Sequence, residues 1–576
     1  MLLLGQIETE TAKQAASAFA TNFTTLDWVI VAVYLSASLL VGVFANKFIH
    51  TVKAYVVAGG GAGTALNVAS QLGTGLGLVT LMYASIDAFT RGFSYTILPL
   101  IAVIVGALTG ATGIVIYRLR EMNLLTIPEF FGRRYGRRVR ILSGSLCAVA
   151  GIVNMGLFPK MGAVFITYVT GCGADVEDTT VIVNVITSVL IVLVLVYTVL
   201  GGMVSVIITD YVQFLVLGIG MAIGIYFCLT SPELGWDRMV DTIAEERGAT
   251  MFNPIAETVS VPPANVDANT LSQIPEEFLK PVLDASGSPE AQSLSAYGWL
   301  WICYMFLVMF FAGLCWAPEA SRALTAKDPT VSKRTVLWSV PGLFARLAIP
   351  TLWGIAAFTL IASNDELRNF FFPTNALYGM QGPVNEPAAA MPLVLGKVIP
   401  AGLLGILVAG LMAAFMSTHD SYFLCWASVI SRDVISPMRG DRLNDREEIF
   451  IMRVSVVLIG LFLLVWGVWY ELPDSVWSYM AVSGTIYLSG AGVTILGGCY
   501  WKHSSTAGAY AGLLTGTLAI AGLFLNHINP QLKSLGIDHE IKIEEVGLFT
   551  FAACAIMFVV FSLLIPDRNT GEARDP

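Results

Sequence analysis

The chain has 576 residues, of which 56% are hydrophobic and only 13% charged, and its mean hydropathy is +0.72. A soluble domain usually carries about 25% charged residues, so this composition excludes a soluble globular protein and indicates an integral membrane protein. The net charge of −9 and the pI near 5.2 argue against nucleic-acid binding, which requires a basic face.

Thirteen segments are long and apolar enough to cross a lipid bilayer, for which a helix needs about 20 residues. In chain order they are 27–46, 64–88, 94–117, 141–169, 180–199, 206–228, 298–318, 336–362, 399–430, 450–470, 476–499, 505–526 and 546–565. We therefore predict an all-α polytopic membrane protein with about thirteen transmembrane helices. The residues outside the spans include a lead-in, 1–26, and a tail, 566–576.

The basic residues are distributed unevenly among the segments that connect the spans. Arginine and lysine gather after the third, seventh and ninth spans, whereas the long segment 229–297 is acidic. Basic loops are retained on the cytoplasmic side of a membrane. The sequence therefore predicts a multi-pass protein of the plasma or inner membrane. The N-terminus and the loop 229–297 would lie outside the cell, and the C-terminus would lie in the cytoplasm.

Two of the predicted spans contain residues that interrupt a helix. The second contains Gly73-Thr-Gly-Leu-Gly77, and the seventh contains Gly313-Leu-Cys-Trp-Ala-Pro318. Five spans separate their starts, so the two segments would enter the membrane from opposite sides. Broken helices in corresponding places of inverted repeats are typical of secondary transporters, although glycine also permits close helix packing. We predict two repeats, 64–228 and 298–499, with an extra N-terminal helix at 27–46 and two C-terminal helices within 505–565.

Four stretches are more specific than hydrophobic periodicity. They are Tyr197-Thr-Val-Leu-Gly-Gly-Met-Val-Ser-Val-Ile-Ile-Thr-Asp-Tyr-Val-Gln213, Arg322-Ala-Leu-Thr-Ala-Lys-Asp328, Phe344-Ala-Arg-Leu-Ala-Ile-Pro350 and Ala413-Ala-Phe-Met-Ser-Thr-His-Asp-Ser421. They resemble segments of the sodium:solute symporter family, which includes the sodium–glucose and sodium–proline symporters. The resemblance implies a LeuT-like 5+5 inverted repeat, Na⁺ as the coupling ion, a small-molecule substrate and no enzymatic activity.

The resemblance also implies a sodium site between the second and ninth spans. Its ligands would be the carbonyl oxygens of Leu72, Gly75 and Ala414 and the hydroxyls of Ser417 and Thr418. An unwound helix frees carbonyl oxygens, which together with neutral hydroxyls can enclose a monovalent cation. Hydroxyls in a membrane helix also bond to carbonyls of their own helix, which is the structural alternative.

Some members of the family hold a second sodium ion on positions that correspond to four residues here. These are Asp210, Ser417, Asp420 and Ser421. An acid stands at position 420 in place of a hydroxyl, so the sequence leaves open whether these side chains serve a cation or a salt bridge with arginine or lysine.

The substrate site is less clear from the sequence. Sugar-transporting members carry a Glu-Gln pair where this chain has Leu78 and Val79, which argues against a glucose-type pocket. Lys160 and Arg346 lie at membrane depth, where a charge usually faces a cavity or a partner. No acid is evident at matching depth on the neighbouring spans, and this favours a carboxylate-bearing or otherwise anionic solute. Further predicted lining residues are Cys315, Trp316, Trp477, Tyr479, Ser483 and Tyr487.

We therefore predict a sodium-coupled symporter that imports a small organic solute by alternating access. The alternatives are a sugar or polyol symporter of the same family and a transporter-like sensor protein. A membrane-embedded enzyme would need a cluster of nucleophilic or metal-binding residues, whereas the histidines are scattered along the chain. The expected partners are the sodium ion, the solute and the lipid bilayer, and the sequence does not indicate an oligomeric state.

Overall fold

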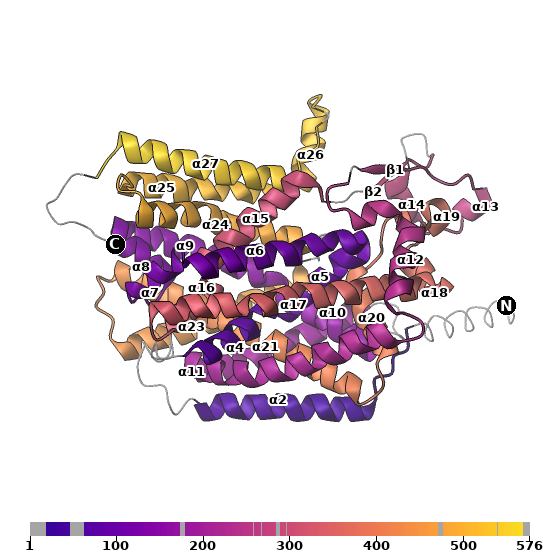
Figure 1. Ribbon diagram of the computed structural model, residues 1–576, viewed down its shortest axis with the longest axis horizontal. Helices are drawn as coiled ribbons and strands as arrows, with labels where there is room; N and C mark the ends of the chain where they lie inside the picture. The colour runs from indigo at the N-terminus through magenta and orange to yellow at the C-terminus, as the bar shows by residue number, and fades with distance from the viewer. Residues whose placement is uncertain are drawn as a thin grey trace.

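The computed structural model describes residues 19–45, 63–172, 179–256, 258–266, 268–283, 288–294, 297–470, 476–537 and 539–567. Long helices lie side by side along one direction and form a bundle (Figure 1). Most of the predicted lead-in 1–26 and of the predicted tail 566–576 lies outside the described residues. Within the described part, eleven helical segments are long and apolar enough to cross a membrane, and α2 contains a shorter apolar helix. The all-α membrane architecture is thus confirmed, whereas the total of thirteen spans stays a prediction.

The first half of the chain consists of helices, several of them interrupted. They are α2 (Thr25–Ala45), α4 (Thr64–Gly75), α5 (Leu78–Arg91), η3 (Gly92–Thr96), α6 (Ile97–Thr112), α7 (Ile116–Glu121), α8 (Ile127–Tyr135), α9 (Arg137–Asn154), η4 (Met155–Leu157), α10 (Phe158–Thr170) and α11 (Thr179–Thr230).

The second half begins after the acidic loop and is also helical. It contains α15 (Gly298–Cys315), α16 (Ala317–Thr325), α17 (Pro329–Ala362), α18 (Asp365–Phe371), α19 (Asn375–Tyr378), η7 (Gly379–Gln381), α20 (Pro387–Val398), α21 (Leu403–Val429), the π-helix η8 (Ile430–Ile435), α22 (Ser436–Met438), α23 (Asp445–Trp469), α24 (Val476–Tyr500), α25 (Thr506–Thr515), η9 (Gly516–Phe524), α26 (Leu525–Ser534) and α27 (Ile543–Leu564).

The acidic segment between the halves folds into short elements. They are α12 (Trp236–Arg247), η5 (Ala249–Phe252), β1 (Val259–Val261), α13 (Ala268–Leu271), α14 (Glu276–Leu279), η6 (Lys280–Val282) and β2 (Gln292–Leu294). The two strands pair antiparallel, a small sheet that the sequence did not predict. These elements gather at one end of the bundle, here called the loop end, and α7 and α8 lie towards the opposite, basic end (Figure 1).

The helix α11 is 52 residues long, or about 78 Å if it were straight, which is more than twice the thickness of a hydrocarbon core. Thr187 in its first half packs against Gly467 near the end of α23, and Gly220 in its second half packs against Leu407 near the start of α21. Both partners lie towards the loop end, so the chain must reverse within α11. This agrees with the two separate spans predicted for the segment.

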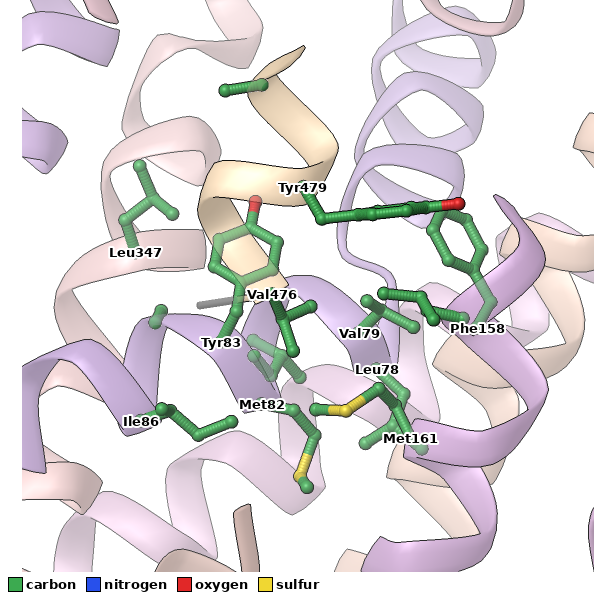
Figure 2. Close-up of a cluster of buried hydrophobic side chains, with 14 of the residues drawn as sticks. Leu78, Val79, Met82, Tyr83, Ile86, Phe158, Met161, Leu347, Val476 and Tyr479 are labelled. Carbon is green, nitrogen blue, oxygen red and sulfur yellow. The ribbon is translucent and has the colours of Figure 1, made fainter. Parts of the chain in front are cut away.

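The core of the bundle surrounds α5. Figure 2 shows Leu78 and Val79 beside Phe158 and Met161 of α10, and Leu78 is completely buried. These are the positions at which the resemblance would place a Glu-Gln pair in a sugar transporter. In this chain they belong to an apolar cluster.

One buried carboxylate, Asp27, joins two helix N-termini. Its Oδ2 accepts hydrogen bonds from the backbone N–H and the hydroxyl of Thr24, at 2.8 and 2.7 Å, at the start of α2. Its Oδ1 accepts from the backbone N–H groups of Gly402 and Gly405, at 2.7 and 2.6 Å, at the start of α21. An anion is stabilised at a helix N-terminus, and here one anion serves two helices. Asp27 therefore fixes α2 to α21.

Replacing Asp27 by alanine is expected to lower the free energy of unfolding by about 2 kcal/mol, because each helix N-terminus loses a cap worth about 1 kcal/mol. Thermal unfolding of the purified protein in detergent measures the effect. The control is Asp365→Ala, which removes an exposed acid from the first turn of α18. Equal melting temperatures for the two variants would contradict the double cap.

Candidate functional site

The second predicted span is broken as expected. Helix α4 ends where the N–H of Leu76 donates to the carbonyl of Leu72 at 2.7 Å, and α5 begins at Leu78. Leu76 (ψ 49°) and Gly77 (ψ 145°) between them are not helical. The carbonyl groups of the last turn of α4 therefore lack the following turn that would otherwise bond to them.

The seventh predicted span is broken too, at Trp316, whose ψ of 112° is extended. Helix α15 ends before it, and α16 begins after it with Pro318 in its first turn. Proline suits this place because it lacks the N–H that an interior helical position requires. Unlike the prediction, the segment does not end at residue 318, because α16 continues to Thr325.

Two hydroxyls of α21 face the open end of α4. Ser417 Oγ donates to the carbonyl of Gly73 at 2.8 Å, and Thr418 Oγ1 donates to the carbonyl of Thr74 at 3.3 Å. Both hydroxyls also lie near the carbonyl of Ala414, at 3.2 and 3.0 Å. The structure thus brings together neutral carbonyl and hydroxyl oxygens from two helices at one place.

The carbonyl groups nearest to these hydroxyls differ from the predicted ones by one residue. The predicted ligands on α4 were Leu72 and Gly75, but the carbonyl of Leu72 already accepts the hydrogen bond that ends the helix. The gap between Gly77 and α21 is narrow. A β-carbon on Gly77 would lie 2.5 Å from Thr418 Oγ1, so only glycine allows the two helices to approach this closely.

Beside this place lies a buried network centred on Arg322 of α16. The side chain is 1% exposed, and its Nη2 donates to Thr74 Oγ1 and Ser421 Oγ, each at 2.6 Å. The same nitrogen lies 3.3 Å from Asp210 Oδ2, which also accepts from Ser70 Oγ at 2.8 Å. The guanidinium therefore supplies a positive charge at the place where the resemblance puts a second sodium ion.

The fourth predicted residue of that set, Asp420, accepts a hydrogen bond from Ser421 Oγ at 3.3 Å. The sequence placed Arg322 in a basic connecting segment after the seventh span. That prediction is wrong, because α16 carries the arginine into the interior. The motif that contains Arg322 has too low an apolar content to indicate a membrane helix.

A cavity of about 190 Å³ lies beside the two breaks. Its polar and aromatic lining residues include Gln71, Tyr83, Asn154, Trp316, Glu319, Arg346, Tyr422 and Trp477. Among the predicted substrate residues, Trp316, Trp477 and Arg346 line it. The other predicted residues, Cys315, Tyr479, Ser483 and Tyr487, are buried among neighbouring side chains and are not part of this lining.

The two predicted cations have different surroundings. Arg346 Nη2 donates to Thr80 Oγ1 at 3.0 Å, and its Nη1 lies 3.5 Å from Glu319 Oε1. Lys160 instead donates to the carbonyl of Tyr470 at 2.8 Å, at the C-terminal end of α23, and is not part of the cavity lining. The expectation that no acid lies at the depth of Arg346 is therefore wrong. Glu319 lies one residue beyond the predicted end of the seventh span, so the sequence pattern places it outside the membrane.

The comparisons with known proteins agree with this geometry. The model of the sodium:solute symporter family matches residues 55–516. The sodium/mannose cotransporter of Bos taurus is 24% identical over 553 residues, covering 88% of this chain and 80% of that protein. The high affinity choline transporter 1 of Homo sapiens is 25% identical over 410 residues, covering 66% of this chain and 60% of that protein.

A solved structure shows the same fold. It is a Na⁺-coupled sialic acid symporter in a substrate-bound outward-open state, with a TM-score of 0.68 at 17% identity, and the match covers 94% of this chain and 98% of that one. The relatives are transporters and not enzymes. The two broken helices, the oxygen-lined contact between them and α21, and a family match over most of the sequence lead to one conclusion: this chain belongs to the sodium:solute symporter family and is a multi-pass membrane protein of Na⁺-coupled symport.

Proposed function

We propose that the protein binds sodium between the open end of α4 and the hydroxyls of α21, and that it imports a small organic solute through the adjacent cavity. The observation that carries the proposal is the pairing of Ser417 and Thr418 with the carbonyls of Gly73 and Thr74. The C-terminal end of a helix carries partial negative charge, which favours a cation. Neutral oxygens suit an ion that must also leave.

The sodium and solute sites share the end of α4. A β-carbon on Gly75 would lie 3.4 Å from Arg346 Nη1, so the last turn of α4 contacts the cavity as well as α21. Sodium would hold this turn against α21 and so complete the cavity wall. Alternating access would then follow from the relative movement of the proposed repeats, 64–228 and 298–499, around the two breaks.

Replacing Ser417 and Thr418 together by alanine is expected to raise the sodium concentration that gives half-maximal uptake about tenfold or more, because two ligands are lost. The measurement is uptake into proteoliposomes over a sodium series. The matched control is Ser428→Ala, because this buried serine of the same helix donates at 2.6 Å to the carbonyl of Leu424 in its own helix. An unchanged sodium dependence in a well-folded double variant would refute the site.

We infer that one sodium ion accompanies each transport cycle. The Arg322 guanidinium contacts Asp210, Thr74 and Ser421, and a second cation among the same oxygens would be repelled by it. The reversal potential of the sodium-coupled current at several sodium gradients gives the stoichiometry. A value of two sodium ions per solute in the wild-type protein would contradict this inference.

The orientation is also a proposal, and it rests on the charge of the connecting segments. A cysteine that replaces the exposed Glu277 of α14 is expected to react with a membrane-impermeant maleimide on intact cells, whereas one at the exposed Arg138 of α9 reacts only after lysis. The background protein should lack the exposed Cys172 and Cys303. The reverse labelling pattern would invert the topology.

The similarity to a sodium/mannose cotransporter supports the polyol or sugar alternative. Against it, Leu78 and Val79 lie in the apolar core of this chain and do not line the cavity. The argument for a purely anionic solute is also weakened, because Glu319 accompanies Arg346 and Lys160 lies elsewhere. A solute that satisfies both charges of the cavity fits better.

A further inference from the structure

The cavity is lined by one negative and one positive side chain. Glu319 belongs to the second broken region, whereas Arg346 belongs to α17 and lies next to the first. Glu319 lies in the first turn of α16, whose N-terminus favours an anion. Arg346 Nη1 lies against Gly75, the last residue of α4, whose C-terminus favours a cation. Each charge is therefore stabilised by a helix end and does not depend on the other charge alone.

The contact between the two charges is loose. Their closest atoms are 3.5 Å apart, and the side chains of Arg346 and Glu319 remain 19% and 28% exposed. Arg346 Nε has no hydrogen-bond partner among the described residues. A partly exposed ion pair of this length contributes little stability, and both groups retain capacity for further hydrogen bonds. The pair can therefore open to admit a ligand between its members.

The same cavity has aromatic walls. The rings of Tyr83 and Trp477 lie 4.3 Å apart, and Trp316 Nε1 donates to the hydroxyl of Tyr422 at 3.1 Å. All four side chains line the cavity together with Glu319. An acid that shares a cavity with aromatic rings is suited to an ammonium group, and a guanidinium is suited to a carboxylate. The chemistry of the walls is therefore complementary to both ends of one molecule.

We propose that the transported solute is a small zwitterion, with its ammonium group at Glu319 and the aromatic walls and its carboxylate at Arg346. This assignment rests on the proposed sodium-coupled uptake and adds the substrate class to it. An anion alone would leave Glu319 facing its negative charge, and a cation alone would face Arg346. The cavity, with a volume of about 190 Å³, has room for a small amino acid or a betaine.

The test uses the full-length protein and two separate measurements. The first is binding of ²²Na⁺ to the purified protein without solute, which tests the sodium site. The second is sodium-driven uptake into proteoliposomes of five labelled probes at equal concentration: glycine betaine, L-proline, choline, propionate and myo-inositol. We expect sodium to bind, and at least one of the two zwitterions to accumulate well above the other three probes.

The two measurements distinguish a wrong substrate assignment from a wrong proposal of sodium-coupled transport. If sodium binds but choline, propionate or myo-inositol is taken up in preference to both zwitterions, or if neither zwitterion is taken up, the substrate assignment is wrong and sodium coupling stands. If sodium neither binds nor drives uptake of any probe, the proposed function is wrong as well.

Charge-removing variants distinguish recognition from a purely structural ion pair. Glu319→Gln is expected to weaken zwitterion uptake at least about tenfold while improving propionate relative to the zwitterion, and Arg346→Gln is expected to improve choline in the same sense. The control Glu277→Gln removes an exposed acid far from the cavity and should leave the preference unchanged. If both cavity variants reduce uptake of every probe by the same factor, the pair has only a structural role and the proposal falls.

Discussion

The structure depends on how backbone polar groups are satisfied inside a membrane. No water is available in the hydrocarbon core, so a spanning helix can be interrupted only where protein groups or a wet cavity meet the freed carbonyl and N–H groups. The break after Gly75 faces the hydroxyls of α21, and the break at Trp316 borders the cavity. The proposed sodium site and the proposed solute cavity consequently lie where the two helices are interrupted.

The same constraint explains the distribution of charge in the interior. Buried arginines are costly unless an acid or several oxygens surround them, and the two arginines beside the breaks each meet an acid. Arg322 contacts Asp210, and Arg346 contacts Glu319. The first pair is almost completely buried and bonded to hydroxyls, which suits a permanent structural element. The second pair is longer and partly exposed, which suits a pair that exchanges partners with a solute.

The sequence predicted the elements whose signals are local. The glycine-rich break and the break near Pro318 are found where the pattern placed them. The resemblance, and not a local pattern, singled out Ser417 and Thr418; their hydroxyls face the first break, and their role as sodium ligands stays a proposal. The sequence prediction failed at Glu319 and Arg322, because α16 is a short polar helix that no hydropathy window detects. Partners far apart in sequence, such as Lys160 and the carbonyl of Tyr470, follow only from the packing of the bundle.

Thr74 connects the proposed sodium site with the buried network around Arg322. Its backbone carbonyl accepts from Thr418 at the proposed sodium site, and its hydroxyl accepts from Arg322 in the buried network. One residue further along, Gly75 lies next to the arginine of the cavity, because a β-carbon there would be 3.4 Å from Arg346 Nη1. A cation bound at the end of α4 would therefore act on the side chains that hold α16 and on the charge that faces the solute. Since α16 also carries Glu319, both charges of the cavity are connected to the sodium site through one helical turn.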